Sequence, residues 1–361
     1  MRGNHGQALF LAAAFAGPVL DIADEPSGGI HLYGDSQIGK STGLKCAASV
    51  WGLPEPTDRL KSWRATANGL EGAAAETNDA FLALDEIGMA DPKQVGEIVY
   101  TIANQTGKAR AARDGSARLP RSWRTFFLST GEVSMAALMA ECAGSPKAGQ
   151  EVRLINVSAQ MMPGYGAIQN LHGWKTASDL LAHLNRRTKA CHGVAARVFL
   201  DRLAIERTRN PDELRQRVLD RRQEVMREML PRGADRQVIS VASRLALTAV
   251  AAELAIEFKV LPWDEAEPAV VATSAFHAWL ESRGGSGPAE DRQAIKRVRL
   301  FLEQFGASRF ETLDESGENV RDERRLGIPR AGYRKKTRDG RDVFLFLPET
   351  WGQRDLQRAG S

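Results

Sequence analysis

The chain has 361 residues, 43% of them hydrophobic and 26% charged, which are the proportions of a globular protein large enough for two domains. Its 49 basic and 45 acidic residues leave a net charge of only +4, so any nucleic acid binding has to depend on where the basic residues lie. The three cysteines, Cys46, Cys142 and Cys191, are odd in number and contain no C-x-x-C pair. This pattern argues against a disulfide framework or a structural zinc and favours the cytoplasm.

The N-terminal segment is apolar. Residues 7–22 are predicted to form a helix that ends before Pro26-Ser27-Gly28-Gly29. Arg2 followed by the apolar run Ala8–Gly17 also resembles a short signal peptide, but the run is too short to span a bilayer. The alternative is an amphipathic helix that covers the domain behind it. The abrupt start leads us to expect that this sequence is part of a longer protein.

Segments typical of strands and helices then alternate along the chain. The expected helices are Thr42–Trp51, Asn68–Asn78 and Pro92–Gln105. The expected strands are Ile30–Tyr33, Leu60–Thr66, Ala80–Leu84, Thr125–Leu128 and Val152–Val157. This alternation predicts an α/β fold in which helices cover both faces of a parallel sheet.

The character of the sequence changes after residue 160. Residues 174–283 have a helical pattern rich in leucine and arginine, and the arginines between 202 and 227 alternate with acidic residues, as on a solvated helix face. Gly284–Pro288 is the clearest linker, and a helix (Arg292–Phe305) and a strand (Asp342–Leu347) are expected after it. The predicted domains are an α/β core (1–165), a helical region (166–283) and a small winged-helix-like domain (284–361). The last could contact a DNA duplex or a partner protein through Arg330, Arg334, Lys335, Lys336 and Arg338.

One motif identifies the class of the α/β core. Gly34–Ser41 matches G-x-x-x-x-G-K-[ST] at each fixed position, after an apolar strand and before a helix. In such a loop the backbone N–H groups converge on phosphate oxygens, the lysine reaches the β and γ phosphates, and the serine binds Mg²⁺. We therefore predict a P-loop NTPase with a RecA/AAA+-like sheet. Its predicted nucleotide-binding residues are Gly34, Asp35, Ser36, Gln37, Ile38, Gly39, Lys40, Ser41 and Thr42.

Acidic and hydroxyl residues at two strand ends complete the predicted site. Asp85 is predicted to hold Mg²⁺ and Glu86 to polarise the attacking water, against the alternative of a solvated acidic strand end. Thr130 or Ser129, at the tip of a later strand, is predicted to sense the γ-phosphate, with a simple strand-ending turn as the alternative. The sequence has no N-K-x-D motif, which favours ATP over GTP.

Residues 107–124 are strongly basic and contain an Asp114-Gly115 turn, which predicts a β-hairpin. Such a hairpin can follow a phosphate backbone without reading bases, whereas the alternative is a solvated basic loop. It lies between the acidic strand and the sensor strand, where ring helicases insert a DNA-contacting loop. The candidate DNA contacts are Lys108, Arg110, Arg113, Arg118 and Arg121.

Arg153 opens the last predicted strand of the core. An arginine in this place can reach the γ-phosphate bound by a neighbouring subunit and stabilise the charge that develops there. An internal ion pair with Glu151 or Glu132 is the alternative.

Several short blocks together resemble the domain-of-unknown-function family 927, found in primase-helicase-like proteins of phages, plasmids and integrated elements. The resemblance runs from about residue 8 to residue 160 and continues more weakly to the end, in Arg330–Tyr333 and Phe346–Pro348. The blocks are Gly34–Ser41, Trp51-Gly52, Trp63 with Thr66, Asn68–Glu71, Leu84–Glu86, Asn104, Gly107–Arg110, Ser129–Glu132 and Gly149–Arg153.

The resemblance implies a relation to ring helicases of superfamily 3, with ATP and Mg²⁺ as cofactors. It implies ATPase roles for Lys40, Ser41, Asp85 and Glu86, DNA contacts by the hairpin and a finger role for Arg153. It assigns no role to Trp63 or Glu71, which by default are a core residue and a solvated one.

We therefore expect an ATP-hydrolysing, DNA-binding motor, a ring-forming and most simply hexameric replicative helicase of a mobile element. Single-stranded or forked DNA is the expected partner, a separate primase a further candidate, and no membrane is involved. The alternatives are an ATP-dependent DNA-binding switch, such as an initiator or loader without unwinding activity, and a nucleotide-dependent assembly scaffold.

Overall fold

The computed structural model describes residues 1–56, 58–107, 110–111, 117–118, 120–142, 148–161, 163–287, 289–313, 319–320, 329–337 and 339–351. The chain forms two compact units, Met1–Ser286 and Gly287–Ser361. The segments expected to form the core and the helical region, 1–165 and 166–283, therefore lie together in the first unit.

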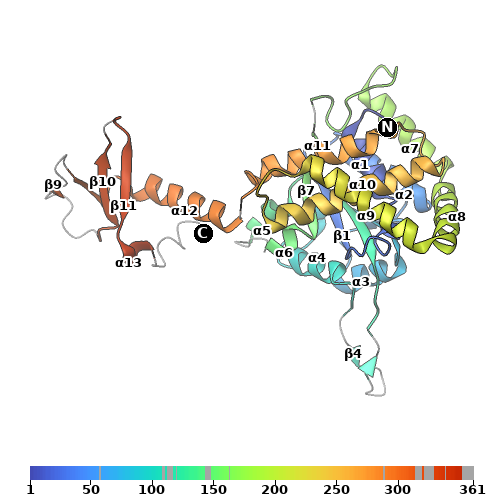
Figure 1. Cartoon of the computed structure of the whole chain (residues 1–361), viewed down its shortest axis with the longest axis horizontal. Helices are drawn as coiled ribbons and strands as arrows, with labels where there is room; N and C mark the ends of the chain where they lie inside the picture. The colour runs from blue at the N-terminus through green and yellow to red at the C-terminus, as the bar shows by residue number, and fades with distance from the viewer. Residues whose placement is uncertain are drawn as a thin grey trace. The chain divides into compact units, whose positions relative to one another are not determined.

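A five-stranded sheet, of which β1 and β7 are labelled in Figure 1, forms the centre of the first unit. Its strand order is β2-β3-β6-β1-β7, and all neighbours are parallel. The predicted parallel α/β sheet is thus confirmed. Because β6 lies between β1 and β3, its end adjoins both the phosphate loop and the acidic pair. The strands are β1 (Gly28–Tyr33), β2 (Leu60–Ser62), β3 (Ala80–Asp85), β6 (Thr125–Gly131) and β7 (Leu154–Ser158).

Alternate residues of the central strands face two separate hydrophobic clusters. On β6, Phe126 and Leu128 pack toward one cluster and Phe127 toward the other. The first cluster contains residues of α1 (His5–Ala13), α2 (Lys40–Trp51) and α10 (Arg236–Glu257). The second contains residues of α3 (Ala67–Glu76), α4 (Val95–Ala103) and α5 (Met135–Ala140). Burial on both faces explains why Phe81–Leu84 of β3 and Phe126–Leu128 of β6 are continuous apolar runs rather than alternating ones.

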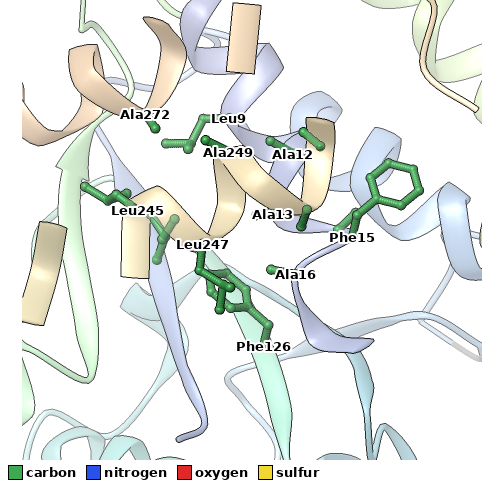
Figure 2. Packing of buried hydrophobic residues seen from close by; sticks show 14 of the residues in the cluster. Leu9, Ala12, Ala13, Phe15, Ala16, Phe126, Leu245, Leu247, Ala249 and Ala272 are labelled. Atoms are coloured by element: carbon green, nitrogen blue, oxygen red, sulfur yellow. The ribbon is translucent and has the colours of Figure 1, made fainter. Parts of the chain in front are cut away.

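The N-terminal segment differs from its prediction. The helix expected over residues 7–22 is instead α1, which ends at Ala13, followed by a 3₁₀ helix, η1 (Gly17–Val19). Pro18 has no backbone N–H to continue an α-helix, which accounts for the break. Nor is α1 an amphipathic cover, because it packs between α2, α10 and α11 (Glu267–Arg283). Figure 2 shows its alanines against α10, where small side chains permit a close approach.

The second half of this unit is helical. After α7 (Ala177–Ala190), α8 (Val194–Arg209) and α9 (Pro211–Met229), the long helix α10 packs Leu247 against Phe126 of the sheet (Figure 2). Among the described helices, α10 is long and apolar enough to cross a membrane, but 78% of its most apolar window is buried inside the protein. That degree of burial is the mark of a core helix.

Several arginines of α8 and α9 pair with carboxylates outside these helices, which the prediction of a solvated helix face did not include. Arg221 contacts Glu253 of α10 at 2.9 Å, and Arg222 contacts Glu25 at 2.8 Å. Arg207 contacts Asp21. Arg207 and Arg222 therefore attach the helical region to the core, whereas Arg221 joins α9 to α10.

The C-terminal unit has a small mixed sheet of order β11-β10-β8-β9, in which β8 and β10 run parallel. Phe301 and Phe310 form its core, with Phe344 and Phe346 packed around them. The described part of this unit contains one long helix beside the sheet, and the likeness to a winged helix stays a prediction. Its elements are α12 (Ala289–Phe305), β8 (Phe310–Leu313), β9 (Asn319–Val320), β10 (Gly332–Lys336), β11 (Asp342–Phe346) and α13 (Pro348–Trp351).

The basic residues of the C-terminal unit are partly neutralised. Arg330 contacts Glu311 at 3.0 Å, and its guanidinium lies 4.8 Å from the centre of the Tyr333 ring. Lys336 lies 3.9 Å from Asp342 and is largely exposed. Arg338 lies outside the described residues.

Candidate nucleotide site and basic hairpin

The phosphate loop connects β1 to α2 through an unusual backbone. Gly34 and Gly39 have φ values of 150° and 97°, in the region that favours glycine, and Gly39 is the residue before the first turn of α2. Gln7 of α1 donates a hydrogen bond of 2.9 Å to the Gly39 carbonyl from behind the loop. The N-terminus of α2 is therefore fixed with its backbone N–H groups turned to the loop, as anion binding requires.

Other loop residues differ in exposure. Asp35, Ser36 and Gln37 are exposed at the tip, whereas the Ile38 carbonyl accepts a hydrogen bond of 3.0 Å from Ala167. Thr42, within the first turns of α2, is buried and accepts a hydrogen bond of 3.1 Å from Asn185 of α7. Its hydroxyl thus faces α7.

Lys40 spans the loop with its ammonium group. Its Nζ donates hydrogen bonds to the carbonyls of Gly34 (2.7 Å) and Asp35 (2.5 Å). Burial lowers the pKa of Lys40, while the nearby carboxylates, of which Glu132 has the largest effect, oppose that shift. The lysine is thus a partly desolvated cation among acidic groups, in a position to exchange loop carbonyls for phosphate oxygens.

Two elements bring hydroxyl groups to a carboxylate at the end of a third. Asp85, at the end of β3, accepts hydrogen bonds on Oδ1 from Thr130 Oγ1 of β6 (2.6 Å) and from Ser41 Oγ of α2 (3.3 Å). Mg²⁺ prefers oxygen ligands and usually keeps several waters, with one or two protein groups beside the phosphates. The Ser41 hydroxyl and the Asp85 carboxylate bring two such oxygen groups together. In the described part of the chain, no group of three or more His, Cys, Asp and Glu that could hold a metal is found.

Glu86 stands at a sharp backbone turn directly after β3. Its φ of 57° is rare for a residue other than glycine and often marks a functional position. Its backbone N–H lies 3.4 Å from Thr130 Oγ1, and its carboxylate accepts a hydrogen bond of 3.3 Å from the Gly88 N–H. The carboxylate is half-exposed beside Asp85.

Ser129 and Thr130, the two candidate sensors, point in different directions, as adjacent strand residues do. Thr130 faces Asp85, whereas Ser129 is fully buried and accepts a hydrogen bond of 2.8 Å from Trp63 Nε1. Ser129 Oγ also lies 2.9 Å from His31 Nδ1, and His31 Nε2 lies 2.9 Å from the Val133 carbonyl.

This arrangement fixes the protonation of His31. A carbonyl can only accept, so His31 Nε2 carries the hydrogen, and Nδ1 accepts from the Ser129 hydroxyl. Burial lowers the pKa of His31 to about 4, and the charge of Lys40 adds to that shift. His31 and Trp63 are buried neighbours of this site that the sequence analysis missed. The available signal was a polar residue within the apolar run of β1.

Arg153 lies at the opposite edge of the sheet from Lys40. Its carbonyl accepts a hydrogen bond from Gly29, at the start of β1, whereas the phosphate loop follows the end of β1, about 16 Å further along an extended strand. Its guanidinium donates to the Gly149 carbonyl (2.7 Å) and lies over the Tyr100 ring at 4.5 Å. Arg153 is therefore separated from the phosphate loop of its own chain.

The basic segment contains the antiparallel strands β4 (Arg110–Ala111) and β5 (Ala117–Arg118), with Arg110 directly opposite Arg118. In Figure 1, β4 projects away from the body of the unit, beyond α3. Arg121 is exposed at the root, where its carbonyl accepts a hydrogen bond of 2.8 Å from the Gly107 N–H. Lys108, Arg113 and the predicted Asp114-Gly115 turn lie outside the described residues.

Comparisons with known proteins bear on the family and the fold. Residues 1–122 match the family described as "Domain of unknown function (DUF927)". The family resemblance is confirmed over these residues. Its wider predicted extent, to residue 160 and more weakly beyond, stays a prediction.

A search of the solved structures found a chain described as "SCCmec type IV Cch - active helicase", with a TM-score of 0.66 and 18% identity. The match covers 96% of this chain and 58% of that one, so this chain spans little more than half the length of its structural neighbour. A search of the curated proteins found no match. The chain therefore shares the fold of a helicase, in an α/β core followed by a helical region and a small C-terminal sheet.

Proposed function

We propose that this protein binds ATP and Mg²⁺ at the phosphate loop and hydrolyses the ATP. The observation that carries the proposal is the meeting of Ser41 and Thr130 hydroxyls on the Asp85 carboxylate, at the mouth of the loop that Lys40 spans. Mg²⁺ would be held through Ser41 and Asp85 and would offset charge on the phosphates. Lys40 would bind the β and γ phosphates, and Glu86 would orient and polarise the attacking water.

The test is phosphate release by the purified chain, with Glu86→Gln as the decisive variant. Removal of a general base typically lowers turnover by about 10²- to 10⁴-fold, and binding of an ATP analogue should persist because the loop is intact. Lys40→Ala should weaken analogue binding itself. Lys45→Ala on the same helix and the exposed Glu141→Gln are matched controls. Wild-type turnover by Glu86→Gln would remove Glu86 from the mechanism.

We further propose that hydrolysis drives movement on single-stranded or forked DNA, as in a replicative helicase of a mobile element. Two observations support this: the fold is that of a helicase, and two arginines oppose each other on a hairpin that projects from the core. Such a hairpin can follow a phosphate backbone. A cytoplasmic location and a separate primase partner belong to the same proposal.

Strand displacement on forks of both polarities separates this proposal from its alternatives. Unwinding that requires ATP hydrolysis supports the helicase. An assembled protein that hydrolyses ATP and binds DNA but displaces no strand is the ATP-dependent switch. A protein that assembles with nucleotide and has no affinity for DNA is the scaffold.

A ring of subunits, most simply a hexamer, is also part of the proposal. Arg153 is too far along the sheet to serve its own site, so a role at the γ-phosphate would place it at the site of a neighbouring copy. The mass of the assembly formed with an ATP analogue measures this directly. A monomer under conditions of full hydrolytic activity would contradict the ring.

A further inference from the structure

We propose that Trp63, Ser129 and His31 form a buried relay that positions the sensor strand and couples the nucleotide site to the root of the basic hairpin. The inference rests on the proposed function, because it describes how ATP bound at Lys40 and DNA bound at the hairpin would influence each other. None of the three residues touches the nucleotide in this proposal. They act by positioning other groups.

The relay is a continuous chain of hydrogen bonds across the sheet. Trp63 Nε1 donates to Ser129 Oγ, the Ser129 hydroxyl donates to His31 Nδ1, and His31 Nε2 donates to the Val133 carbonyl. Trp63, on the loop after β2, is 1% exposed, and Ser129 on β6 and His31 on β1 are 0% exposed. Water therefore cannot replace a lost partner, and a buried donor or acceptor left unpaired is costly.

The relay adjoins the nucleotide site at three points. Ser129 precedes Thr130, whose hydroxyl binds Asp85, and the Trp63 backbone N–H donates to the Asp85 carbonyl at 3.2 Å. Val133 follows Glu132, the carboxylate with the largest effect on the Lys40 pKa. A movement of Thr130 toward a γ-phosphate would therefore move Ser129, which bonds on both sides, and would pull on Trp63.

Helix α3 connects the relay to the hairpin. The helix begins at Ala67, four residues after Trp63. Its N-cap is Thr66, and Thr66 Oγ1 accepts a hydrogen bond of 3.2 Å from the Gly69 N–H. Its 10 residues span about 15 Å, which takes the helix from the nucleotide edge of the sheet toward the opposite edge.

The middle of α3 contacts the hairpin root. Glu71 is only 7% exposed and lies so close to Gly107 that a Cβ on this glycine would stand 2.4 Å from Glu71 Oε1. The Gly107 N–H in turn donates to the Arg121 carbonyl. A shift of α3 is therefore transmitted to both strands at the root. This contact also gives a structural reason for Glu71, whose predicted default was a solvated residue.

The test measures coupling rather than activity alone. The affinity for a fluorescent, non-hydrolysable ATP analogue is measured with and without a single-stranded oligonucleotide, and the ratio of the two affinities is the coupling factor. We expect a factor of about five or more for the wild-type chain, within the usual range for coupled sites. Trp63→Phe keeps an aromatic ring but removes the Nε1–H, and its factor should fall to within about twofold of one. Each ligand alone should still bind within about threefold of wild type, which a general loss of structure would not allow.

Trp51→Phe is the matched control, because its Nε1 donates to a carbonyl, Ala14 O at 2.8 Å, outside the relay. It should keep the wild-type factor. Ser129→Ala removes both central bonds and should behave as Trp63→Phe does. Should these two variants fail to fold, Gly107→Ala decides alone, because it displaces Glu71 at the far end of the path and should also lower the factor.

The relay is overturned if Trp63→Phe, or Gly107→Ala in its place, keeps the wild-type factor. It is equally overturned if the wild-type chain binds both ligands without coupling. Failure of the wild-type chain to bind the ATP analogue is a different result, because it contradicts the proposed ATPase function itself. It is seen in the first titration, before any variant is made.

Discussion

Acidification should destabilise the folded chain through His31. Its ring is 0% exposed, and both ring nitrogens are already engaged, Nδ1 with the Ser129 hydroxyl and Nε2 with the Val133 carbonyl. Burial lowers its pKa to about 4, from 6.5 in an exposed histidine. Protonation of Nδ1 would break the hydrogen bond from the Ser129 hydroxyl. It would also place a positive charge in a buried position near Lys40.

The sign follows from the two pKa values. Between pH 6.5 and about pH 4 the unfolded chain binds a proton at this residue that the folded chain refuses, so the free energy of unfolding falls as the pH falls through this window. The contribution of His31 is constant above the window and below it. From this shift we expect a loss of about 2 kcal/mol between about pH 7.5 and about pH 5, and of about 3 kcal/mol by about pH 4.

The comparison that isolates His31 is with His31→Gln, which keeps an amide donor for the Val133 carbonyl but does not titrate. Urea unfolding at about pH 7.5 and about pH 5 should show that wild type loses about 2 kcal/mol more than the variant. His192→Gln, at an exposed position, is the control for the loss of a histidine. Among the six histidine ring signals in an NMR titration, the one absent from His31→Gln should have a midpoint near 4. If the difference in the free energy of unfolding between wild type and His31→Gln does not change with pH, His31 is not buried in the neutral form.

Two further predictions concern the finger and the hairpin. Mixing Arg153→Ala subunits with Lys40→Ala subunits should restore part of the ATP hydrolysis that each variant lacks alone, because mixed interfaces pair an intact loop with an intact arginine. Normal hydrolysis by Arg153→Ala alone would exclude a role of Arg153 at the γ-phosphate. Replacing Lys108, Arg110 and Arg113 by alanine should weaken single-stranded DNA binding and lower the slope of log affinity against log salt by about two, as loss of three phosphate contacts requires. An unchanged affinity and slope would show that the hairpin is not the contact.

The parts of the site that could be predicted from the sequence depend on short segments. The phosphate loop needs only eight consecutive positions and the strand and helix that flank them, so Gly34–Ser41 could be placed from its own spacing. Asp85 and Glu86 follow from an apolar strand that ends in acidic residues. The end of the first helix was misplaced because the apolar run continues beyond Ala13, and hydrophobicity alone does not show that Pro18 breaks the helix.

The relay could not be predicted, because its members come together only through strand order. Trp63 follows β2, Ser129 lies on β6 and His31 lies on β1. No local pattern shows that Ser129, rather than Thr130, faces Trp63. The same holds for Glu71, whose alanine-rich helix has the composition of an exposed one. Its burial depends on the contact with Gly107, which is distant in sequence.

Strand direction also bears on how copies would assemble. In a parallel sheet, residues that follow strands lie at one edge and residues that precede strands lie at the other. Lys40 follows β1, whereas Arg153 precedes β7 and the hairpin precedes β6. Contact between Arg153 of one copy and the phosphate loop of the next would therefore join two different surfaces of the same protein. An interface of that kind is head-to-tail, and it generates a closed ring when the rotation between neighbours closes. A two-fold symmetric dimer that buried the same surface on both copies would leave each nucleotide site without the arginine, and such a dimer with full ATPase activity would count against the finger and the ring together.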